Sequence, residues 1–160
     1  MRCGGWQSTG TPHRLELTDP RSTRLMACDS AFGGMMVGFD AGRFAATWAS
    51  AWNARDLASV LAHFHEDVIF TSPIAAQIDP ATSGIVRGKE ALSSYWRAAL
   101  AKNPHLHFTV TEVFEGIDSV FIRFRNEMGA DRIEALRFRD GLVAEGHGTF
   151  KVAHQALERR

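Results

Sequence analysis

The last third of the sequence contains four strand-like segments that are separated only by short, turn-prone joints. The segments cover residues 106–116, 119–128, 132–140 and 142–152, and the joints between them contain the letters ID, GAD and DG. Joints this short that contain Gly or Asp connect neighbouring antiparallel strands. This feature restricts the chain to folds that contain an antiparallel meander.

Helical periodicity dominates the part of the chain that precedes the meander. Asp40 is a good helix N-cap, and after it Phe44, Trp48 and Trp52 recur four residues apart on one apolar stripe. The predicted helices lie at residues 41–52, 57–64 and 88–103. Because helices come first and a meander follows, we expect an α+β domain whose helices cover one face of a curved sheet.

One further strand and one long connection are predicted between the second and third helices. Residues 67–73 are rich in β-branched and aromatic side chains, and Pro73 is expected to stop the strand. The connection from Pro73 to Gly88 is longer than usual for a compact domain. Such segments are often lids or binding loops, so we expect this one to be irregular and functional.

The patterned region defines the domain boundaries. Residues 1–38 mix Gly, Ser, Thr, Pro and Arg without a period, so a poorly ordered extension is expected there. Met35 and Met36 directly precede the patterned part, and translation from one of them is an open alternative. The domain is predicted at 39–154 and a tail at 155–160. Both cysteines lie in the extension, so a structural disulfide or zinc site inside the domain is not expected.

The composition argues against some classes of binding partner. Lys and Arg total 18, Asp and Glu also total 18, and 45% of the residues are hydrophobic. A neutral balance argues against a nucleic-acid binder, and no apolar run reaches the roughly 18 residues of a membrane helix. We see no signal-peptide pattern and expect a cytoplasmic protein without nucleic-acid or membrane partners. The seven histidines show no metal-ligand spacing, so neither a metal nor a cofactor is expected.

Strand alternation places one carboxylate on the inner side of the meander. Because Arg137 and Arg139 occupy the outer side of their strand, Glu134 must face inward. The same reasoning places Asn126 inward on the preceding strand. A carboxyl that is buried without a cation has a raised pKa, which suits a general acid or base.

Two glycines in the last segment share a parity. If Phe150 is a core residue, Ala144, Gly146 and Gly148 face inward with it, and the two glycines leave open space. His147 then points outward. A β-bulge is the alternative, since it would bend the sheet without any ligand and would change the side on which His147 lies.

Three phrases of the sequence resemble a known family. They are WASAWNARDLASVLAHFHEDVIFTSP, GIVRGKEALSSYWRAAL and LRFRDGLV. Together they are similar to the SnoaL-like branch of the nuclear transport factor 2-like superfamily, over residues 40–153. The resemblance implies a cone-shaped domain in which three helices pack on a strongly bent antiparallel sheet and enclose a pocket. It also implies a homodimer formed through the outer face of the sheet.

The resemblance maps two catalytic sets onto this chain, and both are incomplete. Isomerases of the superfamily place a tyrosine, an aspartate base and a protonated acid where this chain has Trp48, Ser72 and Glu134. Only Glu134 is an acid, and serine cannot take a proton from carbon without a neighbouring base. Cyclase-like members place a histidine and an acid where this chain has Gly146 and Gly148.

These observations lead to two hypotheses. The first is a small-molecule-binding protein in which Glu134 is the acid or base of an isomerase-, cyclase- or dehydratase-type proton transfer on a hydrophobic ligand. The second is a non-catalytic ligand-binding or dimerisation module, because the expected base is missing. The residues expected to contact the ligand are Trp48, Trp52, Phe70, Ser72, Tyr95, Trp96, Asn126, Gly146 and Gly148.

Overall fold

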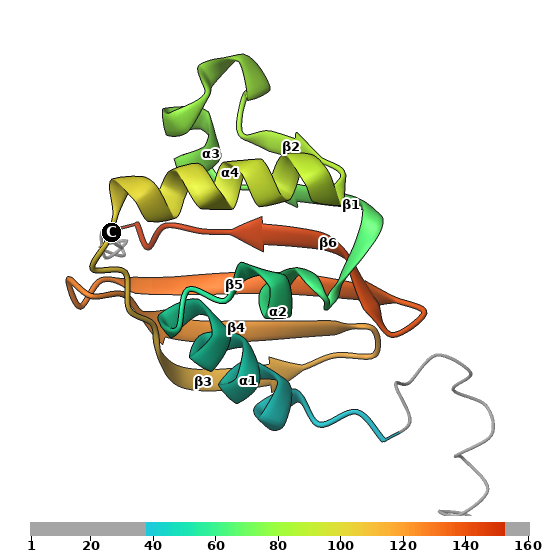
Figure 1. The fold of residues 1–160 in the computed structure, drawn as a ribbon. Coiled ribbons are helices and arrows are strands. Elements are labelled where there is room, and N and C mark those ends of the chain that lie inside the picture. Colours follow the sequence, from blue (N-terminus) through green and yellow to red (C-terminus); the bar gives the residue numbers. More distant parts are fainter. Residues whose placement is uncertain (1–37, 153–160) are drawn as a thin grey trace, which may run out of the picture. The chain divides into compact units, whose positions relative to one another are not determined.

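One open, curved six-stranded sheet with helices on one side carries the fold (Figure 1). The computed structural model describes residues 38–152. The α-helices are α1 (Ala41–Asn53), α2 (Leu57–Leu61), α3 (Pro73–Ile78) and α4 (Lys89–Lys102), and a short 3₁₀ helix spans Pro80–Thr82. The strands are β1 (Phe64–Thr71), β2 (Ile85–Arg87), β3 (Thr109–Glu115), β4 (Ser119–Arg125), β5 (Asp131–Arg139) and β6 (Leu142–Gly148). The α+β class and the curved sheet are confirmed. The predicted tail, and the predicted extension except Gly38, lie outside the described residues.

Helix α1 forms where the sequence places its cap and its apolar stripe. The Asp40 carboxylate accepts a 2.8 Å hydrogen bond from the backbone N–H of Arg43, which satisfies one of the free donors at the helix start. Phe44, Trp48 and Trp52 are buried on the side that faces the sheet. Helix α1 packs on β3, whereas α4 packs on β1 and β2.

The connection predicted as an irregular loop contains regular structure. Pro73 does not simply stop β1, because it occupies the first turn of α3. The Ser72 side chain caps this helix by accepting a hydrogen bond from the N–H of Ile74. Ser followed by Pro is a helix-start signal as well as a turn signal, and the helical reading is the correct one here.

The centre of the sheet differs from the predicted meander in one respect. The strand order is β2-β1-β6-β5-β4-β3, and the four C-terminal strands pair antiparallel as predicted. Strand β1, however, pairs in parallel with β6. It also begins at Phe64, which the helical periodicity had assigned to the second helix. The sheet is therefore mixed rather than wholly antiparallel.

Strand β6 contains a β-bulge, which the sequence left open as an alternative. Val143 pairs with Phe138 and Glu145 pairs with Arg137, so Ala144 has no partner on β5. Val143 is fully buried in place of Ala144. The predicted core position of Phe150 is also wrong, because β6 ends before it and its side chain is 37% exposed.

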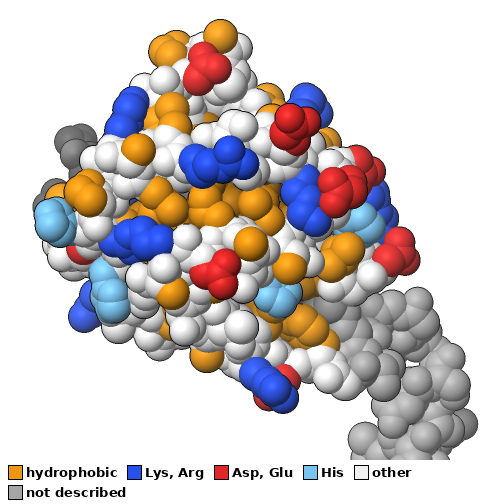
Figure 2. Space-filling view, viewed as in Figure 1, with side chains coloured by type: hydrophobic (Ala, Val, Ile, Leu, Met, Phe, Trp, Pro, Cys, Tyr) orange, Lys and Arg blue, Asp and Glu red, His pale blue; other side chains and the backbone are white. Residues whose placement is uncertain are grey.

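The core lies between the helices and the inner face of the sheet. Trp48, Ile122 and Leu136 are among its fully buried side chains. On the helix-covered face, hydrophobic side chains also reach the surface in a band along α4, with charged side chains around it (Figure 2). Within residues 38–152, no helix has both the length and the apolar composition needed to cross a membrane.

Candidate functional site

A cavity of about 430 Å³ opens at one end of the sheet. Its lining residues come from α1, the end of β1, α3, the C-terminal half of α4, the ends of β4 and β6, the start of β5 and the segments that follow or precede these elements. The volume falls within the range of about 300–1,000 Å³ that is typical of small-molecule sites. The predicted site residues that line it are Trp48, Trp52, Phe70, Ser72, Tyr95, Trp96, Asn126, Glu134 and Gly148.

Aromatic rings form much of the cavity wall. Trp52 and Trp96 meet edge to face with ring centroids 4.9 Å apart, and Trp48 stacks on Phe108 at 5.4 Å. Phe124 packs on Phe108 at 4.4 Å. Phe108 was not among the predicted site residues, although the predicted strand 106–116 includes it, and it lies just before the observed start of β3. Rings in contact at these spacings give a stiff apolar wall suited to a ring-containing ligand.

Glu134 is a buried acid on this wall. Its residue exposure is 7%, which confirms the inward orientation that the alternation predicts. Burial raises the pKa of Glu134 to about 8. Across residues 38–152, no hydrogen bond or ion pair to its carboxyl group is found, so nothing offsets the cost of charging it. The group is therefore mostly protonated at neutral pH.

Ser72 and Tyr95 form a hydroxyl pair close to Glu134. The Tyr95 hydroxyl donates a 3.0 Å hydrogen bond to Ser72 Oγ. Burial raises the pKa of Tyr95 to about 12, with a smaller contribution in the same direction from the charge of Glu134 and an opposing one from the hydrogen bond to Ser72. The phenol therefore stays neutral over the physiological range. Tyr95 was predicted only as an aromatic wall residue, so its polar contact is new.

The two glycines of β6 play different roles. A Cβ on Gly148 would lie 3.4 Å from Ser72 Oγ and 3.5 Å from Glu134 Oε2, so this glycine borders cavity space. A Cβ on Gly146 would lie only 2.6 Å from the Phe70 ring. The prediction that Gly146 leaves cavity space is therefore wrong. The volume beside it is filled by Phe70, and Gly146 is required for packing.

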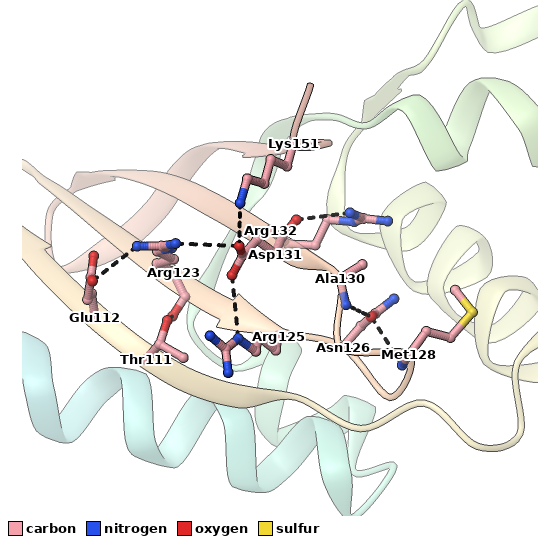
Figure 3. A network of polar contacts seen from close by, with 10 residues as sticks. All are labelled: Thr111, Glu112, Arg123, Arg125, Asn126, Met128, Ala130, Asp131, Arg132 and Lys151. Atoms are coloured by element: carbon pink, nitrogen blue, oxygen red, sulfur yellow. Dashed lines mark hydrogen bonds and ion pairs between the residues drawn. The ribbon is translucent and has the colours of Figure 1, made fainter. Parts of the chain in front are cut away.

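Asn126 borders the cavity but uses its side-chain oxygen within its own turn. Its Oδ1 accepts hydrogen bonds from the backbone N–H groups of Met128 (3.2 Å) and Ala130 (2.8 Å), as Figure 3 shows. These bonds close the β4–β5 turn. Only the amide NH₂ group of Asn126 is then available to a ligand.

Figure 3 also shows a cluster of charges beside this turn. The Asp131 carboxylate lies 2.7 Å from Lys151 Nζ, 3.4 Å from the Arg123 guanidinium and 3.7 Å from that of Arg125. The hydrogen bond from Lys151 is the main cause that lowers the pKa of Asp131. The cluster ties the segment after β6 to the strands that carry Glu134.

Polar side chains at the cavity mouth were missed by the sequence reasoning. They are Gln77, Lys102, Asn103, Glu127 and Arg132. Asn103 donates a 2.8 Å hydrogen bond to Glu127, and the Arg132 guanidinium lies 4.6 Å from the centre of the Phe150 ring. Arg132 shares the strand parity of Glu134, so the alternation could have identified it. The other four lie near the ends of elements or in turns, where periodicity gives little information.

No histidine within residues 38–152 lines the cavity. The ring of His147 points outward and its Nδ1 lies 2.8 Å from Thr71 Oγ1, so the bulge in β6 does not turn it inward. Among the described residues, His, Cys, Asp and Glu side chains form no group of three that could hold a metal ion.

Comparison with known proteins gives a consistent result. Residues 45–146 match the family described as SnoaL-like domain. A crystal structure of a SnoaL-like protein of unknown function from Burkholderia thailandensis shares 36% sequence identity. The match covers 70% of this chain and 94% of that chain, with a TM-score of 0.66. No curated protein matches this chain.

More distant solved structures share the fold. TerC, co-crystallised with polyporic acid, matches at 16% identity over 70% of this chain and 92% of that chain, with a TM-score of 0.58. A putative polyketide cyclase from Sinorhizobium meliloti matches at 14% identity over 64% of this chain and 90% of that chain, with a TM-score of 0.55. At these identities the likeness concerns architecture alone.

Proposed function

Since this chain belongs to the SnoaL-like domain family, we propose that its cavity binds a small hydrophobic molecule and that Glu134 exchanges a proton with it. The observation that carries the proposal is a buried, uncompensated carboxyl group on an aromatic cavity wall. A pKa of about 8 leaves the group able to give a proton at neutral pH and to recover it from solvent. The reaction class is cofactor-independent isomerisation, cyclisation or dehydration.

The residues of the site fit a role for Glu134 as a general acid better than a role as a general base. Ser72 occupies the position where isomerases of the superfamily have their base, and its oxygen is already an acceptor for Ile74 and Tyr95. Glu134 would therefore donate its proton to a ligand oxygen while water removes a proton from carbon. The resulting enol returns to the ketone by the reverse steps, which leaves Glu134 protonated again.

A simple exchange reaction tests this proposal. In D₂O, the protein should speed the exchange of the α-hydrogens of 1-tetralone, measured by NMR. Glu134→Gln should reduce the protein-dependent rate by about 100-fold, because the amide can hydrogen-bond but cannot transfer the proton. The wild-type rate should fall as the pH rises above about 8, where Glu134 loses its proton. A Glu134→Gln rate equal to that of wild type would remove this residue from the chemistry.

The second candidate function is non-catalytic. The outer face of the sheet favours dimerisation. Phe114, Phe121 and Ile133 are 56%, 42% and 40% exposed on adjacent strands of that face. Contiguous apolar side chains on a sheet surface mark interaction sites. We infer that this face joins two copies of the chain in a homodimer, as the family resemblance implies.

The dimer has its own test. Phe121→Glu should convert a dimer into a monomer in light scattering coupled to gel filtration, because a dimer of the variant would have to bury two extra negative charges. Glu115→Gln, an exposed change on β3, should leave the mass unchanged. A wild-type chain that remains monomeric at high micromolar concentration would contradict the proposed dimer.

A further inference from the structure

Three residues from neighbouring strands lie side by side at the inner end of the cavity. Gly148 ends β6 and pairs directly with Glu134 on β5. On the other side, Thr71 at the end of β1 pairs with His147, so Ser72 follows beside Gly148. Gly148, which lies between Glu134 and Ser72, has no side chain. Its two neighbours therefore face a common gap.

Ser72 has one proton that no described residue receives. Its oxygen accepts hydrogen bonds from the Ile74 N–H at 3.1 Å and from the Tyr95 hydroxyl at 3.0 Å, which occupies both of its lone pairs. The Tyr95 and Ser72 hydroxyl groups carry one proton each, and the hydrogen bond between them uses only one of the two. One hydroxyl proton is therefore left without an acceptor, whichever group donates. Ser72 is 6% exposed and lines the cavity. A buried donor of this kind is costly unless something accepts from it.

Glu134 presents a second unused proton to the same gap. Its carboxyl group is neutral below about pH 8 and has no acceptor within residues 38–152. The other titratable side chains on the cavity wall are Tyr95, Lys102, Glu127 and Arg132. None of them forms a hydrogen bond or ion pair with Glu134 in the described part of the chain.

Ser72 and Glu134 border the same small space beside Gly148. The point where a Cβ on Gly148 would lie is 3.4 Å from Ser72 Oγ and 3.5 Å from Glu134 Oε2, and no other heavy atom outside the immediate backbone is closer. We propose that Ser72 and Glu134 form a two-donor site for one carbonyl oxygen of the ligand, seated in the gap that Gly148 leaves. This inference rests on the proposed function and specifies its ligand class.

The rest of the cavity indicates what kind of molecule carries that carbonyl group. Two donors that border one small space recognise an acceptor oxygen and reject an ammonium group or another donor. Phe70, Trp52 and Trp96 line the same cavity, and Trp96 contacts both of the other rings. Flat aromatic surfaces favour a planar ring system. The expected ligand is therefore a fused-ring ketone or quinone whose carbonyl points towards Gly148.

A matched pair of probes tests the two-donor site. 9-Fluorenone and fluorene have the same tricyclic skeleton, and the ketone carries an oxygen where the hydrocarbon has only hydrogens. Tryptophan fluorescence should show that wild-type protein binds fluorenone about tenfold more tightly, which is the effect expected of one or two neutral hydrogen bonds. The carbonyl stretching band of bound fluorenone should also move to lower frequency than in hexane, in a measurement that needs no variant.

Gly148→Ala is the decisive variant. A methyl group fits there at ordinary contact distances, so the fold should be retained while the oxygen position is filled. The preference for fluorenone should disappear, as it should in Ser72→Ala. Gly42→Ala adds the same methyl group on α1, outside the cavity, and should keep the preference for fluorenone. Glu134→Gln should keep a preference that no longer changes between pH 6 and pH 9, because its amide still donates.

The outcomes separate this inference from the proposed function. If wild-type protein binds both probes with equal affinity and the carbonyl band is unshifted, the gap holds only water and the two-donor site is wrong, although the cavity still binds apolar molecules. If Gly148→Ala folds and keeps the full preference, the site is also wrong. If neither probe binds and 1-tetralone exchange is not accelerated, both the two-donor site and the proposed function fail.

Discussion

Glu134→Gln is expected to make the protein more stable, by about 3–5 kcal/mol at pH 8 and above. Burial raises the pKa of Glu134 from 4.5 to about 8, and each pKa unit corresponds to about 1.4 kcal/mol. Below pH 4.5 the group is protonated in both the folded and the unfolded chain, so it has no effect on stability. Between pH 4.5 and 8 the unfolded chain gives up the proton while the folded chain keeps it. Wild-type stability should therefore fall through this window and level off above it.

Urea unfolding of both proteins from pH 4 to pH 9 measures this difference. The two free energies of unfolding should be close at pH 4 and should separate steadily up to about pH 8. Glu115→Gln makes the same chemical change at an exposed position on β3 and should follow the wild type throughout. Parallel curves for wild type and Glu134→Gln would mean that the carboxyl group is not buried as described. A gain in stability on removing a titratable group is a mark of functional rather than structural selection.

Gly146→Ala is expected to destabilise the fold by about 3 kcal/mol, at the upper end of the range for overpacked cores. The new Cβ would lie 2.6 and 2.8 Å from two atoms of the Phe70 ring and 3.4 Å from Leu136. Phe70 is 3% exposed and packs against Trp96, so it has little room to move away. Either β6 or the aromatic wall must shift.

Gly148→Ala is the natural control, since it lies two residues further along the same strand. Its methyl group would make only ordinary contacts, the nearest at 3.4 Å. Thermal melts of the two variants should therefore differ clearly, with Gly146→Ala well below the wild type and Gly148→Ala close to it. Equal melting temperatures would show that the Phe70 ring can rearrange at low cost.

Alternation and turn chemistry predicted the strands that carry Glu134. The arginines on the outer side of β5 fix the inward position of Glu134, and short joints fix the antiparallel order from β3 to β6. Local patterns of this kind are determined by neighbours in the sequence, so they can be recognised in one chain. The same alternation predicted the inward position of Asn126, which lies on the cavity wall.

Features that depend on tertiary contacts were not recognisable. The bulge at Ala144 shifts the alternation by one residue. The two glycines suggested a bulge as an alternative, but they do not determine its presence or its position. The different surroundings of Gly146 and Gly148 depend on the positions of Phe70 and Ser72, which come from another strand. The parallel pairing of β1 with β6 joins segments more than seventy residues apart, and periodicity gives no information on such pairings.

The place of β6 between β1 and β5 has a consequence during synthesis on the ribosome. A nascent chain that lacks residues 142–148 has one two-stranded piece, β2-β1, and one three-stranded piece, β5-β4-β3, each with an unpaired edge. Exposed edges of this kind recruit strands from other molecules. Completion of the last strand closes both edges at once and also brings Gly148 between Ser72 and Glu134. Premature termination before residue 142 should therefore yield aggregates rather than a weakened but folded protein.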